Sequence, residues 1–223
     1  MKIMSKIKEH YHDQIEAGQR TRNEKPILFS TPMVQAILEG RKTQTRRVIK
    51  PQPVIKLMDE TTCKFRIEKW EKFASGINVK LKELGNSFLG IGGFCPYGQP
   101  GDLLWVRERF ETDTDGLVKF YASNPEVINN SCYRKLTKWK PSIHMPKAVA
   151  RIWLKIKDVR IEKLQDISYA DAKAEGVEYP HDFYDLWFKI HGPISWDNNP
   201  WVWVVEFEVV STSGKPEPET ISE

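Results

Sequence analysis

The chain has 223 residues, a net charge of +4, 29% charged residues and 40% hydrophobic residues. These values predict one globular domain with a proper core, and they exclude a chain that is disordered throughout. No apolar run approaches the roughly 18 residues of a membrane-spanning helix, and the charged N-terminal stretch lacks the apolar part of a secretory signal. Three scattered cysteines and five histidines match neither a disulfide framework nor a zinc site, so we expect a cytoplasmic protein without metal or cofactor.

Charge is distributed unevenly along the chain. Residues 1–50 hold eleven Lys or Arg against five acidic residues, whereas the last eighteen residues hold five Glu against one Lys. Such polarity is typical of a surface that faces a polyanion. An ordinary solvated surface is the alternative.

In chain order, the sequence predicts a polar N-terminal arm, one domain and an acidic, disordered tail, over residues 1–25, 26–210 and 211–223. Strands are predicted at 27–30, 103–106, 118–121, 150–164 (one long strand or a bent pair) and 201–209, and helices at 31–40, 168–176 and 183–190. The stretch 51–96, with Pro51 and Pro53 at its start and a Gly-rich end, is interpreted as an insertion. Because strands dominate and the helices are short, the pattern favours an α+β fold around a small barrel over a doubly wound sheet.

The segment after the first predicted helix is unusually basic. It carries four cations and two hydroxyl groups in seven residues. The cations are Arg41, Lys42, Arg46 and Arg47. A solvated turn at a helix C-terminus explains this density without a function, because cations there favour the helix dipole. The functional interpretation is that Lys42 activates a hydroxyl, with Thr45 three residues away, or that the cations hold phosphates.

Two further places in the sequence could carry chemistry. Glu175 lies in the last turn of a predicted helix, where a carboxylate opposes the helix dipole. It is either an ordinary exposed residue or a functional one. The stretch 139–147 combines Trp139, His144 and Lys147 with two prolines. Aromatic and basic residues together can clamp a nucleobase, and a rigid loop over the core is the alternative.

These residues belong to a pattern that resembles the ASCH domain family. The mark of that family is a G-x-K-x-x-T-x-R stretch after the first helix, here Gly40, Lys42, Thr45 and Arg47. The resemblance begins with PILFSTPMVQAILEGRKTQTRRVIKPQP and continues, in the expected order, at PGDLLWVRERF, at SIHMPKAVARIWLKIKDVRIEKLQDISYADAKAEGV and at NPWVWVVEFEVV. The arrangement is most similar to the longer ASCH-like proteins of phages and prophages, which implies a bacterial host cytoplasm.

The resemblance implies a PUA-like fold, which is a small mixed β-barrel with flanking short helices. PUA-like domains commonly bind RNA or read modified bases, so we expect a nucleic-acid- or nucleotide-binding protein with a basic cleft. The residues expected to hold phosphate are Arg41, Arg46, Arg47 and Lys147. The Arg46-Arg47 doublet is more basic than an uncharged nucleoside requires, which favours a ligand that bears phosphate.

The resemblance also implies an alternative activity. Small ASCH proteins include N4-acetylcytidine amidohydrolases, whose Lys, Thr and Glu fall on Lys42, Thr45 and Glu175 here. In that reading Thr45 attacks the acyl carbonyl or positions a water, Lys42 accepts the proton, and Glu175 orients Lys42 or passes a proton to the leaving amine. Other ASCH-like proteins are ribonucleases. A third alternative is a non-enzymatic phage accessory protein that binds a protein partner.

Overall fold

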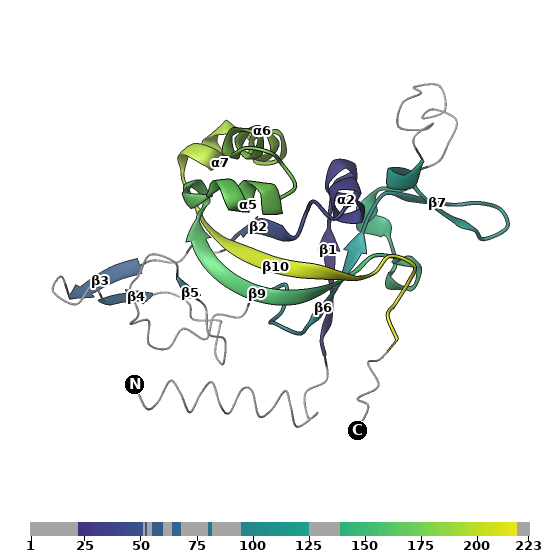
Figure 1. Ribbon diagram of the computed structural model, residues 1–223, viewed down its shortest axis with the longest axis horizontal. Coiled ribbons are helices and arrows are strands. Elements are labelled where there is room, and N and C mark those ends of the chain that lie inside the picture. The colour runs from purple at the N-terminus through teal and green to yellow at the C-terminus, as the bar shows by residue number, and fades with distance from the viewer. Residues whose placement is uncertain are drawn as a thin grey trace.

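The computed structural model describes residues 22–50, 52, 55–59, 64–67, 80–81, 95–124 and 139–217 (Figure 1). Most of the predicted N-terminal arm, much of the predicted insertion and the end of the predicted tail lie outside these residues. Within them, six strands form one mixed sheet in the order β1-β6-β9-β10-β2, with β5 paired to β9. The strands are β1 (Glu24–Leu28), β2 (Gln44–Val48), β5 (Lys80–Leu81), β6 (Leu103–Arg107), β9 (Trp153–Lys163) and β10 (Trp201–Ser211).

The centre of the sheet is the long antiparallel pair of β9 and β10, which curves strongly along its length (Figure 1). At one edge, β6 pairs antiparallel with the beginning of β9, and β1 lies parallel to β6. At the other edge, β2 pairs antiparallel with β10. The α+β class is therefore confirmed. The predicted barrel is not, because the two edge strands do not pair with each other within the described residues.

Helices cover both faces of the sheet. Side chains alternate along β10, so its residues divide between two cores. On one face they pack with α2 (Thr31–Leu38), in a cluster that contains Val34, Ile37, Trp203, Val205 and Phe207. On the other they pack with α6 (Pro180–His191), in a cluster that contains Phe183, Trp187, Val202 and Val204. The helices α5 (Tyr169–Ala174) and α7 (Pro193–Asp197) lie beside α6 (Figure 1).

Smaller elements complete the described part of the chain. β3 (Ile55–Asp59) and β4 (Lys64–Ile67) pair with each other inside the predicted insertion, and β7 (Phe110–Thr112) pairs with β8 (Val118–Phe120). Single 3-10 turns are η1 (Tyr121–Ser123), η2 (Ser142–His144), η3 (Lys147–Val149) and η4 (Leu164–Asp166). None of the described helices is long and apolar enough to cross a membrane.

The sequence-based expectation and the structure differ most at β2. The basic segment shows no alternation of apolar residues, so the sequence predicts no strand there. The structure places Gln44–Val48 opposite Val202–Glu206 of β10, and this pairing overrides the local pattern. Two boundaries also differ. β1 begins at Glu24, inside the predicted arm, and β10 runs to Ser211, after which Lys215 pairs with Glu24 at 3.0 Å.

Gly176, directly after α5, allows that helix to pack closely against α2. Its φ is +89°, a left-handed conformation that disfavours side chains. A Cβ at this position would lie 3.0 Å from the Cβ of Ala36 and 3.1 Å from the Cβ of Lys42. Both backbone conformation and close approach therefore require glycine here.

We expect Gly176→Ala to destabilise the protein more than Gly116→Ala does. Gly116 has a similar φ of +81° but open space around it, so its substitution tests backbone strain alone, about 1–2 kcal/mol. The contacts at Gly176 should add about 1–3 kcal/mol. Urea unfolding of both variants measures the difference. Equal losses would contradict the close packing of α5 on α2.

Candidate functional site

Lys42 and Glu175, two of the three predicted catalytic residues, meet where β2 begins and α5 ends. The two residues form an isolated antiparallel bridge. The Lys42 ammonium lies 2.7 Å from Oε2 of Glu175 and 2.8 Å from its backbone carbonyl oxygen. The exposed fractions of the side chains are 0% and 2%. The fold thus brings two charged residues that lie 133 positions apart into a buried ion pair.

Backbone hydrogen bonds on three sides fix the position of Lys42. The amide of Lys42 donates to the carbonyl of Ala36, in the last turns of α2, at 3.0 Å. The amide of Thr43 donates to Ala174 of α5 at 2.8 Å, and the carbonyl of Thr43 accepts from Phe207 of β10 at 2.9 Å. The residues around the lysine are therefore held by α2, α5 and β10 together.

Burial is the main influence on the lysine. It lowers the pKa of Lys42 from the usual 10.5, because the charged form is separated from water. Glu175 acts in the opposite direction as a counter-charge, and the nearby cations Arg47 and Arg46 add to the lowering. A lysine with a lowered pKa supplies neutral amine, the form that accepts a proton, at a lower pH than an exposed lysine does.

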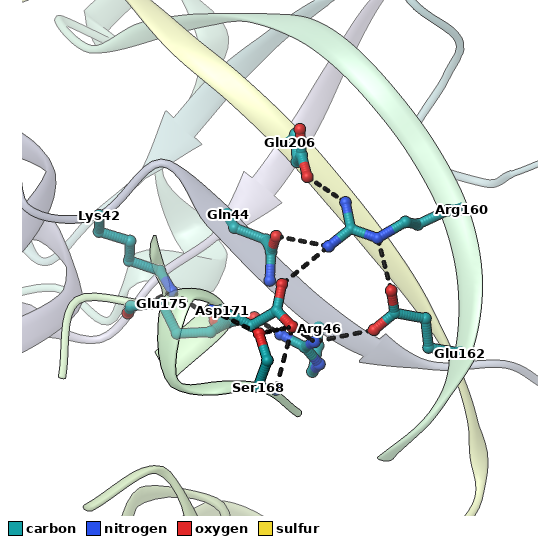
Figure 2. Close-up of polar contacts among 9 residues, drawn as sticks. All are labelled: Lys42, Gln44, Arg46, Arg160, Glu162, Ser168, Asp171, Glu175 and Glu206. Carbon is teal, nitrogen blue, oxygen red and sulfur yellow. Dashed lines mark hydrogen bonds and ion pairs between the residues drawn. The ribbon is translucent and has the colours of Figure 1, made fainter. Parts of the chain in front are cut away.

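Arg46 lies beneath this pair and is fully buried. Its Nη1 is 3.4 Å from Oε1 of Glu175, and its Nη2 is 2.9 Å from Oε2 of Glu162 and 3.3 Å from Oδ2 of Asp171 (Figure 2). The sequence analysis expects Arg46 to hold phosphate. In the structure its guanidinium contacts three carboxylates of the protein instead.

A second arginine, Arg160 of β9, binds two of these three carboxylates. Its Nε donates to Glu162 at 2.6 Å, and its Nη2 donates to Asp171 at 3.0 Å and to Gln44 at 2.8 Å (Figure 2). Glu206 of β10 also forms an ion pair with Arg160. The Lys42–Glu175 pair is therefore one end of a connected group of charged side chains.

This group of charged side chains was not predicted from the sequence. The signal in the sequence is the spacing of its polar residues. They recur every second residue along the strands and every fourth along the helix, so they share one face of each element, where apolar residues are expected. The members with this spacing are Lys42, Gln44 and Arg46, then Arg160 and Glu162, and finally Asp171 and Glu175. Such a pattern indicates a buried polar face only when the partners from the other strands are known.

Thr45, the third predicted catalytic residue, lies on the opposite side of β2 from Arg46. It pairs with Val205, whose side chain belongs to the core under α2. Thr45 is buried, and no hydrogen bond joins its hydroxyl to Lys42 or Glu175 within the described residues. The structure thus brings the lysine and the glutamate together, and it shows no direct contact of the threonine with either.

Arg47 shares its side of β2 with Thr45. Its guanidinium lies over the rings of Phe29 and Tyr97, with the central carbon 5.2 and 5.9 Å from the ring centroids, and it donates to the carbonyl of Leu28 at 2.6 Å. The Lys42 ammonium is 5.8 Å from the centroid of the same Phe29 ring. Phe29 is therefore a common neighbour of both cations.

The other two predicted phosphate ligands lie in different places. Arg41 is exposed, donates to the carbonyl of Gly176 at 2.9 Å and pairs with Glu39 at the surface, so it flanks the ion pair. Lys147 pairs with Glu24 of β1, and no contact joins it to the Lys42–Glu175 pair within the described residues.

Other reactive groups are sparse in the described part of the chain. No cluster of three His, Cys, Asp or Glu side chains there has the arrangement that holds a metal ion. Cys95 is buried, and burial raises the pKa of its thiol to about 11. Little nucleophilic thiolate therefore forms at neutral pH.

Comparison with known proteins identifies no family. No family model and no curated protein matches the chain. A crystal structure of a protein from Enterococcus faecalis, described by the family model DUF984, matches with 11% sequence identity and a TM-score of 0.39. The match covers 97% of this chain and 99% of that chain. A likeness at this level carries no argument about function, so the proposals below depend on the residues of the site.

Glu175→Gln is expected to lower the free energy of unfolding by about 3–5 kcal/mol at neutral pH, because it leaves a buried ammonium without its counter-charge. Glu39→Gln is the matched control. It breaks the exposed pair with Arg41, and such pairs contribute up to about 1 kcal/mol. Chemical denaturation measures both, and similar losses would contradict the buried ion pair.

The loss in Glu175→Gln should also shrink as the pH rises. The substitution removes the carboxylate that raises the pKa of Lys42. In the folded variant, Lys42 therefore releases its proton at a lower pH than in the unfolded chain, where the lysine has its usual pKa of 10.5. Where the unfolded state binds more protons, stability increases with pH. A loss that stays constant between neutral and alkaline pH would show that Lys42 does not carry the effect.

Proposed function

We propose that the protein binds a modified cytosine nucleoside or nucleotide and hydrolyses its N4-acyl amide. The observation that carries this proposal is the contact of 2.7 Å between the Lys42 ammonium and the Glu175 carboxylate, with both side chains buried. Amide hydrolysis needs a base for the nucleophile and an acid for the leaving amine, and paired titratable groups can supply both. The resemblance to ASCH domains supports the choice of substrate, and it supports assigning the curved mixed sheet to the PUA-like class.

In the proposed reaction, the neutral amine of Lys42 takes the proton of the attacking hydroxyl, from Thr45 or from water. The oxygen forms a bond to the acyl carbon. The carbon–nitrogen bond then breaks, and the proton passes from Lys42, with Glu175 orienting it or relaying the proton, to the leaving nitrogen. Where Thr45 attacks, water hydrolyses the acyl-threonine in a second step. One water is consumed, and the products are the carboxylic acid and the cytosine amine.

The placement of Arg47 supports a ligand site beside the ion pair, because Arg47 and Lys42 share Phe29 as a neighbour. The side chains of Thr45 and Arg47 lie on one side of β2, and the Arg47 guanidinium and the Lys42 ammonium both lie over the Phe29 ring. Arg41 flanks the pair at the surface. We assign Arg41 and Arg47, rather than Arg46 or Lys147, to the phosphate or acyl oxygen of the ligand.

Lys42→Ala, Thr45→Ala and Glu175→Ala should each abolish deacetylation of N4-acetylcytidine, or of a short RNA that contains it, while the protein stays folded. Lys157→Ala is the control, because this exposed lysine is 3.9 Å from Glu208 and belongs to no described part of the site. Chromatographic separation of the nucleosides follows turnover, and circular dichroism follows folding. Full turnover by Lys42→Ala would overturn the proposal, and full turnover by Thr45→Ala would exclude the threonine as nucleophile.

A second candidate function is recognition of a modified base or nucleotide without hydrolysis. The specific observation in its favour is the buried Nε of Arg47, which has no hydrogen-bond partner within the described residues. The Nε atoms of Arg46 and Arg107 are also buried without a partner, but the Arg46 guanidinium binds three carboxylates, whereas no ion pair joins Arg47 to a carboxylate within the described residues. The donor of Arg47 therefore fits an oxygen of a bound ligand. In this case the Lys42–Glu175 pair fixes the shape of the site and transfers no proton.

Binding of the acetylcytidine-containing RNA should weaken between about 50 and about 200 mM salt, because each phosphate contact releases counterions. Arg41→Ala and Arg47→Ala should each reduce the slope of log affinity against log salt by about one. Lys157→Ala should leave it unchanged. Fluorescence anisotropy measures these slopes, and affinity that does not vary with salt would argue against a phosphate-bearing ligand.

A further inference from the structure

Arg46 and Lys42 each bind one carboxylate oxygen of Glu175. One carboxylate oxygen of Glu175, Oε2, is 2.7 Å from the Lys42 ammonium, and the other, Oε1, is 3.4 Å from Nη1 of Arg46. The Arg46 side chain has an exposed fraction of 0%. A carboxylate held by one cation at each oxygen has a fixed orientation, which a single ion pair does not give.

The charges of the buried group balance. Within the described residues, the buried group contains three cations and three carboxylates, and the ion pairs among them connect all six residues. The balanced cluster consists of Lys42, Arg46, Arg160, Glu162, Asp171 and Glu175. Glu206, which is 41% exposed, closes the cluster at the surface through Arg160. Removal of one buried member leaves an uncompensated charge in a site with little water.

The cluster also fixes α5 at both of its ends. At the first turn, Asp171 is bound by Ser168 in a capping box, by Arg46 and by Arg160 (Figure 2). At the end of the helix, Glu175 is bound by Lys42 and Arg46. Arg46 is therefore the side chain that contacts both ends of α5, four residues apart.

The surroundings of Arg46 leave little freedom for another role. Its guanidinium lies 5.9 Å from the ring centroid of Phe183 in α6, so a helix covers it on the side away from the sheet. A phosphate contact would require this buried arginine to leave three carboxylates. The geometry therefore favours a role within the protein.

We propose that Arg46 is a positioning residue. It joins Glu175 to the rest of the cluster and directs one oxygen of Glu175 at Lys42, without touching the substrate. The effect of Arg46 on catalysis rests on the proposed hydrolysis, whereas its role in the cluster is independent of that activity.

The test compares Arg46→Met and Arg46→Lys with the wild-type protein. Arg46→Met removes one positive charge at nearly constant volume, so the folded variant should take up a proton that the wild type does not. Its loss of stability should therefore be larger at about pH 8 than at about pH 6. Arg46→Lys keeps the charge, and its loss should vary little with pH. A role in packing alone predicts a loss that is independent of pH in both variants.

The second readout is hydrolysis. Because Glu175 is no longer held in position, Arg46→Met should lower kcat by about 10- to 100-fold. It should also shift the rising limb of the pH–rate profile to higher pH, since Arg46 lowers the pKa of Lys42. Arg46→Lys should restore part of kcat.

Arg151→Met is the matched control for both readouts. Arg151 donates to both oxygens of Glu108, a carboxylate that is 1% exposed and lies outside the cluster. Its substitution should destabilise the protein in a similar way and leave kcat unchanged. Wild-type kcat in Arg46→Met, or a pH-independent stability loss in that variant, would overturn the proposal.

The outcomes separate this proposal from the proposed function. If the wild-type protein hydrolyses no acyl amide, the proposed function fails, and the proposed effect of Arg46 on catalysis fails with it. The stability measurements still test whether Arg46 neutralises the buried carboxylates of the cluster. If Arg46→Met does not fold, the kcat of Arg46→Lys decides: a kcat below that of the wild type supports the positioning role, and a wild-type kcat overturns it. A salt slope of RNA binding that is reduced by about one in Arg46→Met would show a phosphate contact and overturn the positioning role.

Discussion

The ion pair of Lys42 and Glu175 sets the position of α5 on the sheet. Two charges taken out of water are tolerated only when the geometry is good and the remaining polar atoms find partners. The Lys42 ammonium also caps the C-terminus of α5, because it donates a hydrogen bond to the backbone carbonyl oxygen of Glu175. The Glu175 carboxylate alone would oppose the helix dipole, because the C-terminus of a helix already carries a partial negative charge. The Lys42 ammonium compensates both the carboxylate and this partial charge.

The other charged side chains of the cluster follow from the need of each buried charge for a partner. Arg46 and Arg160 neutralise the other buried carboxylates, and the residues that carry these charges come from β2, β9 and α5. The apolar clusters on the two faces of β10 hold the sheet and the helices, and Ile167 and Val177, on either side of α5, pack against the cluster under α6. The ion pairs add contacts from β2 and β9 to both ends of α5. A shift of β2 by one residue against β10 would turn its polar side chains toward the core under α2, so the ion pairs also favour the observed strand register.

Sequence reasoning predicted the elements whose signals are local. The helix predicted at 168–176 and the strands predicted at 150–164 and 201–209 correspond to α5, β9 and β10. β2 was not predictable in the same way, because Gln44–Val48 is a polar stretch that becomes a strand only through pairing with β10. Lys42 and Glu175 were recognisable as local anomalies, and the resemblance connected them. The burial of Arg46 depends on carboxylates more than 110 positions away, which no local pattern contains.

The most direct measurement is an NMR titration of the Lys42 side chain in the full chain, assigned by the loss of its signal in Lys42→Met. We expect Lys42 to titrate below its usual pKa of 10.5 and Glu175→Gln to lower the pKa further, because the carboxylate stabilises the ammonium. A lysine that titrates at 10.5 or above, and that does not respond to Glu175→Gln, would contradict the buried pair on which both the fold of α5 and the proposed proton transfer depend.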